Sequence, residues 1–319
     1  MYRRIERFEE NIMNAEHYDA IILGAGAAGL TAGIYLSRAN LKTLIINEGS
    51  IGGQMVLTHA VANYPGVLEA SGRDISLIMK KQAKEFGCKI ESNVEVTKLD
   101  LTSKKKMIEI DDDEVFTSDV VILATGGKPR KLGAKNEDKF KGLGISYCAT
   151  CDGDFYTDKD VIVVGGGNSA LEEAVSLTKW VRSIIIIHQF DNFQAHEYAI
   201  EQAEKNDKIS FILESEVTEY LGEQQVEGVI IQNQKTGEFT ELKTDGVFVY
   251  VGYIPNTDKV KDVIDLSERE EIITDENMQT NIKGVFAVGD VRIKKIRQIT
   301  TAVSDGTIAA LNAIEYLQR

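Results

Sequence analysis

Two glycine-rich turns, each between an apolar strand and a helix, constrain the fold of this chain more than any other feature. The first lies in "YDAIILGAGAAGLTAGIYLSRANLKTLIINEG" and the second in "KDVIVVGGGNSALEEAVSLTKWVRSIIIIH", 141 residues later when counted from Gly24 to Gly165. Each segment has the pattern of a βαβ unit. The sequence therefore predicts an α/β protein with two Rossmann-like dinucleotide-binding domains of three-layer ββα architecture.

The first turn has the residues of a dinucleotide site. Gly24, Gly26 and Gly29 follow the G-x-G-x-x-G pattern, which allows a tight turn and close approach of the backbone to a pyrophosphate. The N-terminus of the following helix adds partial positive charge. Glu48 ends the next strand, where a carboxylate can accept hydrogen bonds from ribose hydroxyls. The alternative is an empty structural turn, and the strand, helix and acid together favour a bound dinucleotide.

Two glycine-rich crossings indicate that one domain is inserted into the other. Strand-like stretches follow each βαβ unit, and a helix with apolar residues at helical spacing closes the chain. The crossings are Gly126-Gly127 and the stretch from Gly252 to Pro255. We expect a discontinuous first domain of residues 1–125 and 254–319, with residues 126–253 inserted as the second domain.

Charge and composition limit the partners of the chain. With 36 basic and 50 acidic residues and a net charge of −14, it is not expected to bind nucleic acid or anionic membranes. No apolar run is long enough to cross a bilayer, and the N-terminal "MYRRIERFEENIMNAEHYD" lacks the apolar segment of a signal peptide. We expect a charged N-terminal arm and a cytoplasmic protein.

A cysteine pair carries the candidate chemistry. Cys148 and Cys151 form a C-x-x-C spacing that can close a small disulfide, and such pairs often contain one thiol of lowered pKa. The adjacent Asp152 could pass a proton to or from a departing thiolate. The alternatives are half a zinc site and two inert core thiols. No metal site is predicted, because the other cysteine and the histidines show no ligand pairing.

The motifs together resemble those of the low-molecular-weight thioredoxin reductases. "GAGAAGLTAGIY", "GGQMVLTHAVANYPG", "CATCDGDFY", "GGGNSALEEA", "VGYIPNT", "VFAVGDV" and "RQITTAVSDGTIAALNA" occur in that family's order and spacing, from about Tyr18 onward. The resemblance implies a domain that binds FAD, an inserted domain that carries the C-x-x-C pair, and a homodimer. Asp154 departs from it, because the family usually has an aromatic or apolar residue there.

The resemblance also assigns roles to individual residues. Cys151 would lie next to the flavin and exchange electrons with it, Cys148 would attack the disulfide of thioredoxin, and Asp152 would be the acid and base. The implied FAD-binding residues come from both ends of the chain: Gly24, Gly26, Ala27, Gly29, Glu48, Gly53, Gln54, Asn63, Asp290, Gln298 and Ile299. The N-terminus of the last helix would favour an anionic reduced flavin.

The second glycine turn lacks the cations that normally accompany it. In this family the strand after it runs into His-Arg-Arg, with a further Arg four residues on, and these arginines grip the 2′-phosphate of NADPH. The corresponding positions here are His188, Gln189, Phe190 and Gln194. We interpret the turn as one kept for packing after its ligand was lost. The branch of the family with this loss takes electrons from reduced ferredoxin, and this chain resembles that branch.

A cluster of cations is the predicted docking site for an acidic ferredoxin. Arg292, Lys294, Lys295 and Arg297 lie in "VRIKKIRQ", directly after Asp290. Such a patch could steer an acidic carrier toward the flavin. The alternative for this segment is an ordinary solvated loop.

Three other functions compete with this interpretation. The first is a thioredoxin reductase that uses NADH or NADPH in an atypical pocket, with Asp191 as an acceptor for the ribose of NADH. The second is a dithiol oxidase on the same scaffold, which passes electrons from a substrate dithiol through the flavin to oxygen. The third is a flavin-loaded redox sensor without turnover, which the retention of both cysteines and Asp152 disfavours.

Overall fold

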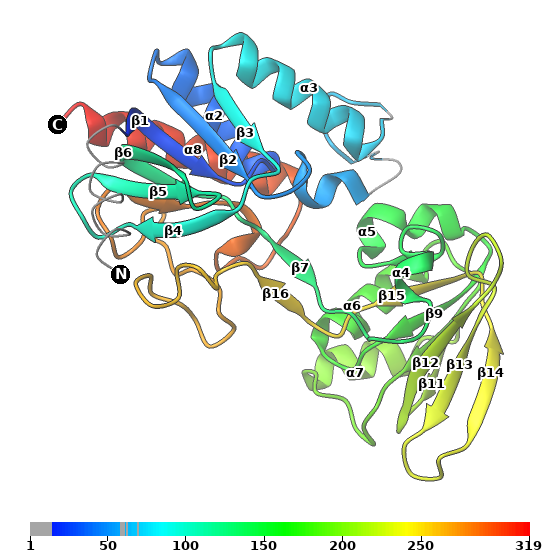
Figure 1. The fold of residues 1–319 in the computed structure, drawn as a ribbon. Coiled ribbons are helices and arrows are strands. Elements are labelled where there is room, and N and C mark those ends of the chain that lie inside the picture. Colours follow the sequence, from blue (N-terminus) through cyan, green and yellow to red (C-terminus); the bar gives the residue numbers. More distant parts are fainter. Residues whose placement is uncertain (1–14, 58–60, 62, 69) are drawn as a thin grey trace. The chain divides into compact units, whose positions relative to one another are not determined.

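A computed structural model describes residues 15–57, 61, 63–68 and 70–319. The chain divides into two compact units, which are described separately: unit 1 comprises Met1–Lys128 and Ile254–Arg319, and unit 2 comprises Pro129–Tyr253. The chain passes from unit 1 to unit 2 through β7 (Gly127–Pro129) and returns through β16 (Tyr253–Pro255) (Figure 1). The predicted first boundary, 125/126, lies three residues before the division at 128/129. The first 14 residues of the predicted N-terminal arm lie outside the described residues.

Unit 1 is built on a seven-stranded sheet in the order β3-β2-β1-β6-β5-β4, with β17 paired to β6. The strands β3, β2, β1, β6 and β17 are parallel, whereas β5 pairs antiparallel with both of its neighbours, β6 and β4. The strands are β1 Glu16–Leu23, β2 Thr43–Asn47, β3 Lys89–Ser92, β4 Val96–Asp100, β5 Lys106–Ile110, β6 Glu114–Leu123 and β17 Val285–Ala287. The helices are α2 Ala27–Arg38, η1 Gly53–Leu57, α3 Gly72–Glu85, η3 Gly289–Val291 and α8 Ile299–Leu317.

Small residues let the helices of unit 1 pack tightly on this sheet. The helices α2, α3 and α8 share one core with the side chains on one face, among them Ile22, Ile45 and Ile122. Gly306 of α8 touches α2 so closely that a Cβ there would lie 2.3 Å from the carbonyl oxygen of Ala28. A second core covers the other face of the sheet and includes Ile272. Both faces are therefore buried, as parallel strands with continuous apolar runs require.

Unit 2 has the same three-layer plan with a parallel sheet in the order β11-β10-β9-β15-β8. The helices α5, α6 and α7 cover one face, and a three-stranded antiparallel sheet, β12-β13-β14, covers the other. The strands are β8 Ile145–Ser146, β9 Asp160–Val164, β10 Ser183–Ile187, β11 Ile209–Ile212, β12 Ser215–Leu221, β13 Gly228–Asn233, β14 Phe239–Lys243 and β15 Gly246–Val249. The helices are α4 Glu137–Phe140, α5 Ala149–Asp152, η2 Gly153–Tyr156, α6 Asn168–Leu177 and α7 Glu197–Glu204.

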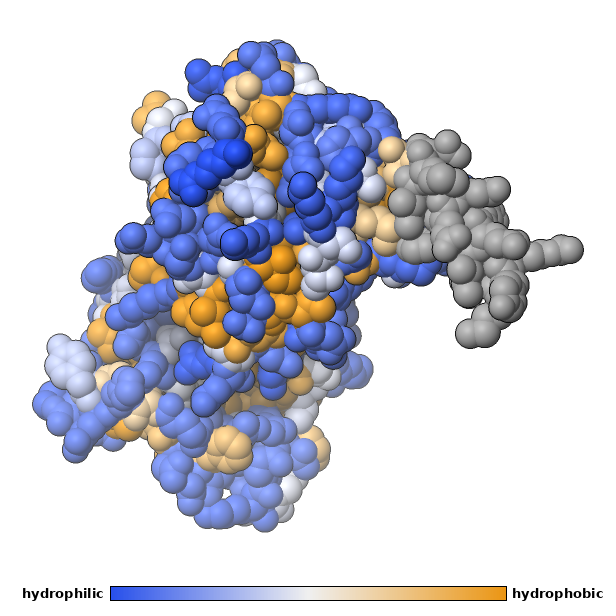
Figure 2. Space-filling model, turned by 90° about the vertical axis from the view of Figure 1, so that its left-hand side faces the viewer, coloured by the Kyte–Doolittle hydropathy of each residue, from blue (hydrophilic) through white to orange (hydrophobic). Residues whose placement is uncertain are grey.

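The predicted fold class is confirmed: both units are α/β structures with Rossmann-like parallel sheets. Figure 2 shows a face on which hydrophilic side chains predominate and hydrophobic ones form smaller groups between them. No helix among the described residues is long and apolar enough to span a membrane.

Candidate functional site

The glycine turn of unit 1 joins β1 to α2 and leaves space for a ligand at one position. Gly24 has φ +110° and a Cβ there would lie 2.2 Å from the carbonyl oxygen of Ala124, while a Cβ at Gly29 would lie 1.9 Å from the carbonyl oxygen of Gly24. A Cβ at Gly26, in contrast, would meet no described atom within 4 Å. Gly26 is the N-cap of α2, whose first residue is Ala27. The protein therefore needs Gly24 and Gly29 for its own packing, and Gly26 leaves the helix N-terminus accessible to an anion.

Two residues that the sequence patterns did not single out support this turn. Asn47, at the end of β2, accepts a hydrogen bond from the backbone N–H of Ala25 through Oδ1, at 2.8 Å. Lys259 pairs with Glu48, and Glu48 also accepts a hydrogen bond from the N–H of Val96 at 2.9 Å; both contacts use Oε1 of Glu48. No signal in the sequence links Lys259 to Glu48, because 211 residues separate them.

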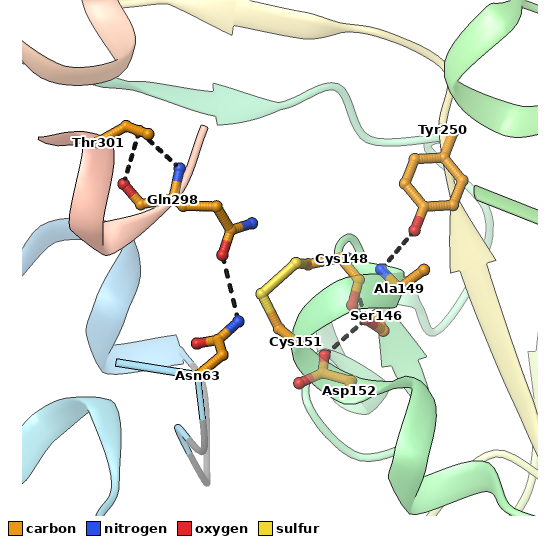
Figure 3. The surroundings of a disulfide bond; sticks show 9 residues. All are labelled: Asn63, Ser146, Cys148, Ala149, Cys151, Asp152, Tyr250, Gln298 and Thr301. Carbon is orange, nitrogen blue, oxygen red and sulfur yellow. Dashed lines mark hydrogen bonds between the residues drawn. A yellow bond between two sulfur atoms is a disulfide. The ribbon is translucent and has the colours of Figure 1, made fainter. Parts of the chain in front are cut away.

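The other residues implied for FAD also lie in unit 1, and several contact one another. A Cβ at Gly53 would lie 3.3 Å from Cα of Gly26. Gln54 donates a hydrogen bond to the carbonyl oxygen of Gly127 at 2.9 Å. Asn63 donates to Oε1 of Gln298 at 3.2 Å (Figure 3). Gln298 is the N-cap of α8 and forms a capping box with Thr301, and Ile299 is the first residue of the helix.

Asp290 supplies an unusual buried acceptor in unit 1. It lies in η3, directly after β17, and its Oδ1 is buried without a hydrogen-bond partner among the described residues. Burial raises the pKa of Asp290, against the opposing effect of Lys294 and Arg297. A buried oxygen of this kind is costly unless a ligand provides a donor. Ribitol or ribose hydroxyls are such donors, so Asp290, the Gly24 turn and the α2 N-terminus fit an FAD molecule.

The prediction of an exposed docking patch is wrong for three of its four cations. Lys294 has only 8% of its side chain exposed, and it donates to Oδ2 of Asp305 at 2.7 Å. Arg292 lies 3.5 Å from the same carboxylate oxygen, with 16% of its side chain exposed. Arg297 pairs with Glu271. Only Lys295 of the four is exposed.

The reason is that these cations pair with carboxylates of unit 1, of which Asp305 is buried. Asp305 lies on the inner side of α8 and also accepts a hydrogen bond from the N–H of Gly289 at 3.1 Å. A buried carboxylate needs a cation and donors. The cations of this segment therefore hold η3 against α8, and the side chains it exposes are Lys295 and the apolar Ile293 and Ile296.

In unit 2, Cys148 and Cys151 form a disulfide with their Cα atoms 5.3 Å apart (Figure 3). Cys148 is the N-cap of α5, a single helical turn that contains Cys151 and Asp152. The N–H of Ala149 donates to the hydroxyl oxygen of Tyr250 at 2.6 Å. Asp152 accepts a hydrogen bond from the hydroxyl of Ser146 at 2.6 Å. The structure thus brings the three predicted redox residues into one turn and adds Ser146 and Tyr250 to it.

The second glycine turn is covered by the segment that follows β10. The ring of His188 lies against Gly166, where a Cβ would be 2.4 Å from the ring, and stacks on Phe193 with ring centroids 5.7 Å apart. Burial lowers the pKa of His188, so the ring is neutral near pH 7. The N–H of Gln194 donates to the carbonyl oxygen of Gly166 at 2.8 Å.

The positions that would hold a 2′-phosphate carry no cation. The Gln194 side chain donates to the backbone and side-chain oxygens of Asn192, at 2.8 and 3.1 Å. Gln189 and Asp191 are exposed, and Phe190 has 50% of its surface exposed. Within the described residues, no group of three or more His, Cys, Asp or Glu side chains is placed to hold a metal ion.

Comparisons with known proteins agree with this geometry. A family model described as pyridine nucleotide-disulphide oxidoreductase matches residues 18–306. The "34.2 kDa protein in rubredoxin operon" of Clostridium pasteurianum is 48% identical to this chain, over 94% of the chain and 97% of that protein. The thioredoxin reductase of Peptoclostridium acidaminophilum is 45% identical, with the same two coverages of 94% and 97%.

A solved structure gives the same result. The crystal structure of thioredoxin reductase from Streptococcus pyogenes MGAS5005 matches with a TM-score of 0.89 at 42% identity, and covers 95% of this chain and 98% of that one. Proteins of this family are FAD-binding flavoproteins, and FAD is the cofactor of this chain. The chain therefore belongs to the pyridine nucleotide-disulphide oxidoreductase family and is a homologue of the bacterial thioredoxin reductases.

Proposed function

We propose that this flavoprotein reduces thioredoxin with electrons from reduced ferredoxin rather than from NADPH. The choice of donor is supported by the residues that follow the glycine turn of unit 2. Three positions that hold arginines in the NADPH-dependent enzymes are Gln189, Phe190 and Gln194, and the amide of Gln194 is bonded to Asn192. The glycine turn beside them is packed against His188.

The size of the expected effect on NADPH binding supports this choice of donor. A charge-assisted hydrogen bond contributes about 1.5–3 kcal/mol, so losing two weakens NADPH binding by roughly a hundred- to ten-thousand-fold. NADH would require an acid at the end of β10 to accept from the ribose diol. The residues there are His188 and Gln189, and Asp191 lies beyond them.

The driving force also favours this reaction. A plant-type ferredoxin near about −400 mV and a thioredoxin near about −270 mV differ by about 130 mV, which is roughly 6 kcal/mol for two electrons. When bound, FAD takes up the electrons and supplies them to the disulfide. An iron–sulfur donor delivers electrons singly, and a flavin accepts one or two.

We assign the roles in the chain as follows. Cys151 exchanges electrons with the flavin, Cys148 attacks the disulfide of thioredoxin, and Asp152 moves the proton. Of the FAD-binding residues, the turn at Gly26 accommodates the pyrophosphate, Glu48 the ribose, and Asp290 a sugar hydroxyl. The remaining proposed FAD contacts are Gly24, Ala27, Gly29, Gly53, Gln54, Asn63, Gln298 and Ile299. We also propose that the enzyme is a cytoplasmic homodimer.

Replacement of the attacking cysteine tests the thioredoxin half of this proposal. The Cys148→Ser enzyme should not reduce thioredoxin, because the remaining thiol has no partner with which to form the disulfide, while its flavin remains reducible by dithionite. Cys88→Ser is the matched control, since Cys88 is a buried free thiol in unit 1, and it should keep the activity. Normal turnover by Cys148→Ser would refute the assignment.

A further inference from the structure

A single buried hydroxyl joins the backbone of Cys148 to the carboxylate of Asp152. Ser146, the last residue of β8, is 4% exposed. Its Oγ accepts a hydrogen bond from the N–H of Cys148 at 3.1 Å and donates to Oδ2 of Asp152 at 2.6 Å (Figure 3). The only other acceptor recorded for this hydroxyl among the described residues is the carbonyl oxygen of Cys148, at 3.4 Å.

The two short contacts decide where the hydroxyl proton lies. A serine hydroxyl has one proton and two lone pairs. One lone pair takes the N–H of Cys148, and the proton goes to the carboxylate, which is the nearer and the charged acceptor. Because Ser146 is buried, water cannot readily replace it. Ser146 therefore links the Asp152 carboxylate to the backbone of Cys148.

Tyr156 and Tyr250 interact electrostatically with Asp152, and Glu173 interacts with Tyr250. Burial, with a smaller effect of Asp152, raises the pKa of Tyr156 to about 12. Burial raises the pKa of Tyr250 well above its ordinary value, followed by the effect of Glu173 and, more weakly, of Asp152. Burial also raises the pKa of Glu173, on α6. Both phenols are neutral near pH 7, so neither places a negative charge beside the carboxylate that accepts the hydrogen bond from Ser146.

We infer that Ser146 is a positioning residue, which holds the Asp152 carboxylate in place at the C-x-x-C turn. The inference rests on the proposed function. In that reaction the substrate S–S bond breaks, the Cys148–Cys151 bond forms, and two electrons and two protons pass from the two thiols to the two substrate sulfurs. Asp152 carries one of these protons, and Ser146 holds it in place to do so.

The test measures one half-reaction, which does not depend on the physiological electron donor. The flavin-loaded enzyme is reduced anaerobically with dithionite, separated from the excess, and mixed with oxidised thioredoxin over pH 5 to 9. Ser146→Ala should slow this step roughly tenfold at pH 7, the effect of one charge-assisted hydrogen bond. The inflection due to Asp152 should move to higher pH, because the carboxylate loses a donor that favours its charged form.

Three further variants separate positioning from a structural effect. Ser215→Ala removes another buried serine hydroxyl of unit 2, bonded only to the carbonyl oxygen of Leu213 among the described residues, and should keep the rate. Ser146→Thr keeps the hydroxyl and should stay within about threefold of the native rate. In an Asp152→Asn background, Ser146→Ala should add no further loss.

The outcomes are distinguishable. An unchanged rate and pH profile in Ser146→Ala, an equal loss in Ser146→Thr, or an equal further loss in the Asp152→Asn background would overturn the role of Ser146. If Asp152→Asn alone has the native rate and pH profile, the proposed function of Asp152 fails, and the inference about Ser146 fails with it.

Discussion

The buried carboxylate of Asp290 is expected to lower the stability of the FAD-free protein and to strengthen FAD binding. A single substitution can separate these two effects. Its pKa is raised because the carboxylate is buried, and its Oδ1 has no partner among the described residues. For an acid with a raised pKa in the folded state, stability is lost as the pH rises from the ordinary pKa to the raised one, and it stays lower above that range. At neutral pH the carboxylate therefore destabilises the FAD-free protein.

Asp290→Asn should raise the melting temperature of the FAD-free protein at pH 7. Each kcal/mol corresponds to about 2–4 °C for a unit of this size. The difference from the native protein should disappear near pH 4 and below, where the native carboxyl is protonated. FAD affinity should fall about tenfold, because a charged acceptor is lost. Calorimetry across this pH range and FAD titration test both effects; a lower melting temperature in the FAD-free variant at pH 7 would contradict the account.

Sequence patterns predicted some of these residues and missed others for a physical reason. The C-x-x-C spacing lets Cys148 and Cys151 meet within one turn, so local sequence made the disulfide one of the expected outcomes. The low exposure of Lys294 depends on Asp305, which faces inward only after α8 packs on α2. Closely spaced cations in a sequence suggest an exposed patch. Only the packing of α8 shows that most of these cations pair with carboxylates.

At the scale of elements, the β1-turn-α2 unit separates glycines needed for folding from the one that leaves room for a ligand. A Cβ at Gly24 would collide with the carbonyl oxygen of Ala124, whereas a Cβ at Gly26 would meet no described atom within 4 Å. Gly26 also has φ −77°, which alanine adopts without strain. We therefore expect a phosphate of the cofactor to lie against Gly26.

Gly26→Ala should leave the folded protein intact and reduce its FAD content. The FAD-free variant should melt at the native temperature or slightly above it, since the substitution lowers the entropy of the unfolded chain. Gly24→Ala is the matched control and should fail to fold stably, because its φ of +110° and its close contact both exclude a side chain. Flavin absorbance per protein measures the result; full FAD content in Gly26→Ala would show that the phosphates lie elsewhere.

In the second βαβ unit, the sequence pattern predicts the strands, the turn and the helix but not the contacts of the segment that follows. The glycine spacing predicts the turn between β9 and α6, and this turn is present. The pattern does not show that His188 covers Gly166 or that Gln194 bonds to Asn192, because those contacts depend on the path of the segment between β10 and α7. The sequence alone shows that positions 189, 190 and 194 have no cation. The structure adds which atoms the segment contacts instead.

At the scale of the whole molecule, the arrangement of the chain was largely predictable. Two glycine turns 141 residues apart, with apolar strands around them, indicate two Rossmann-like units, and each compact unit contains a core of parallel strands. The β12-β14 layer of unit 2 and the antiparallel β4 and β5 of unit 1 have alternating patterns that indicate strands but not partners. Pairing between distant strands is set by packing, which no local pattern encodes.

The central claim is that electrons enter from ferredoxin, and its most direct test is an anaerobic titration of the flavin. The purified, FAD-loaded protein is mixed separately with NADPH, with NADH and with reduced ferredoxin, and the loss of visible flavin absorbance is followed. We expect reduced ferredoxin to bleach the flavin and neither nicotinamide to do so at concentrations that saturate an ordinary thioredoxin reductase. Rapid bleaching by NADPH or NADH would contradict the account, because Gln189, Phe190 and Gln194 would then line a working nicotinamide pocket.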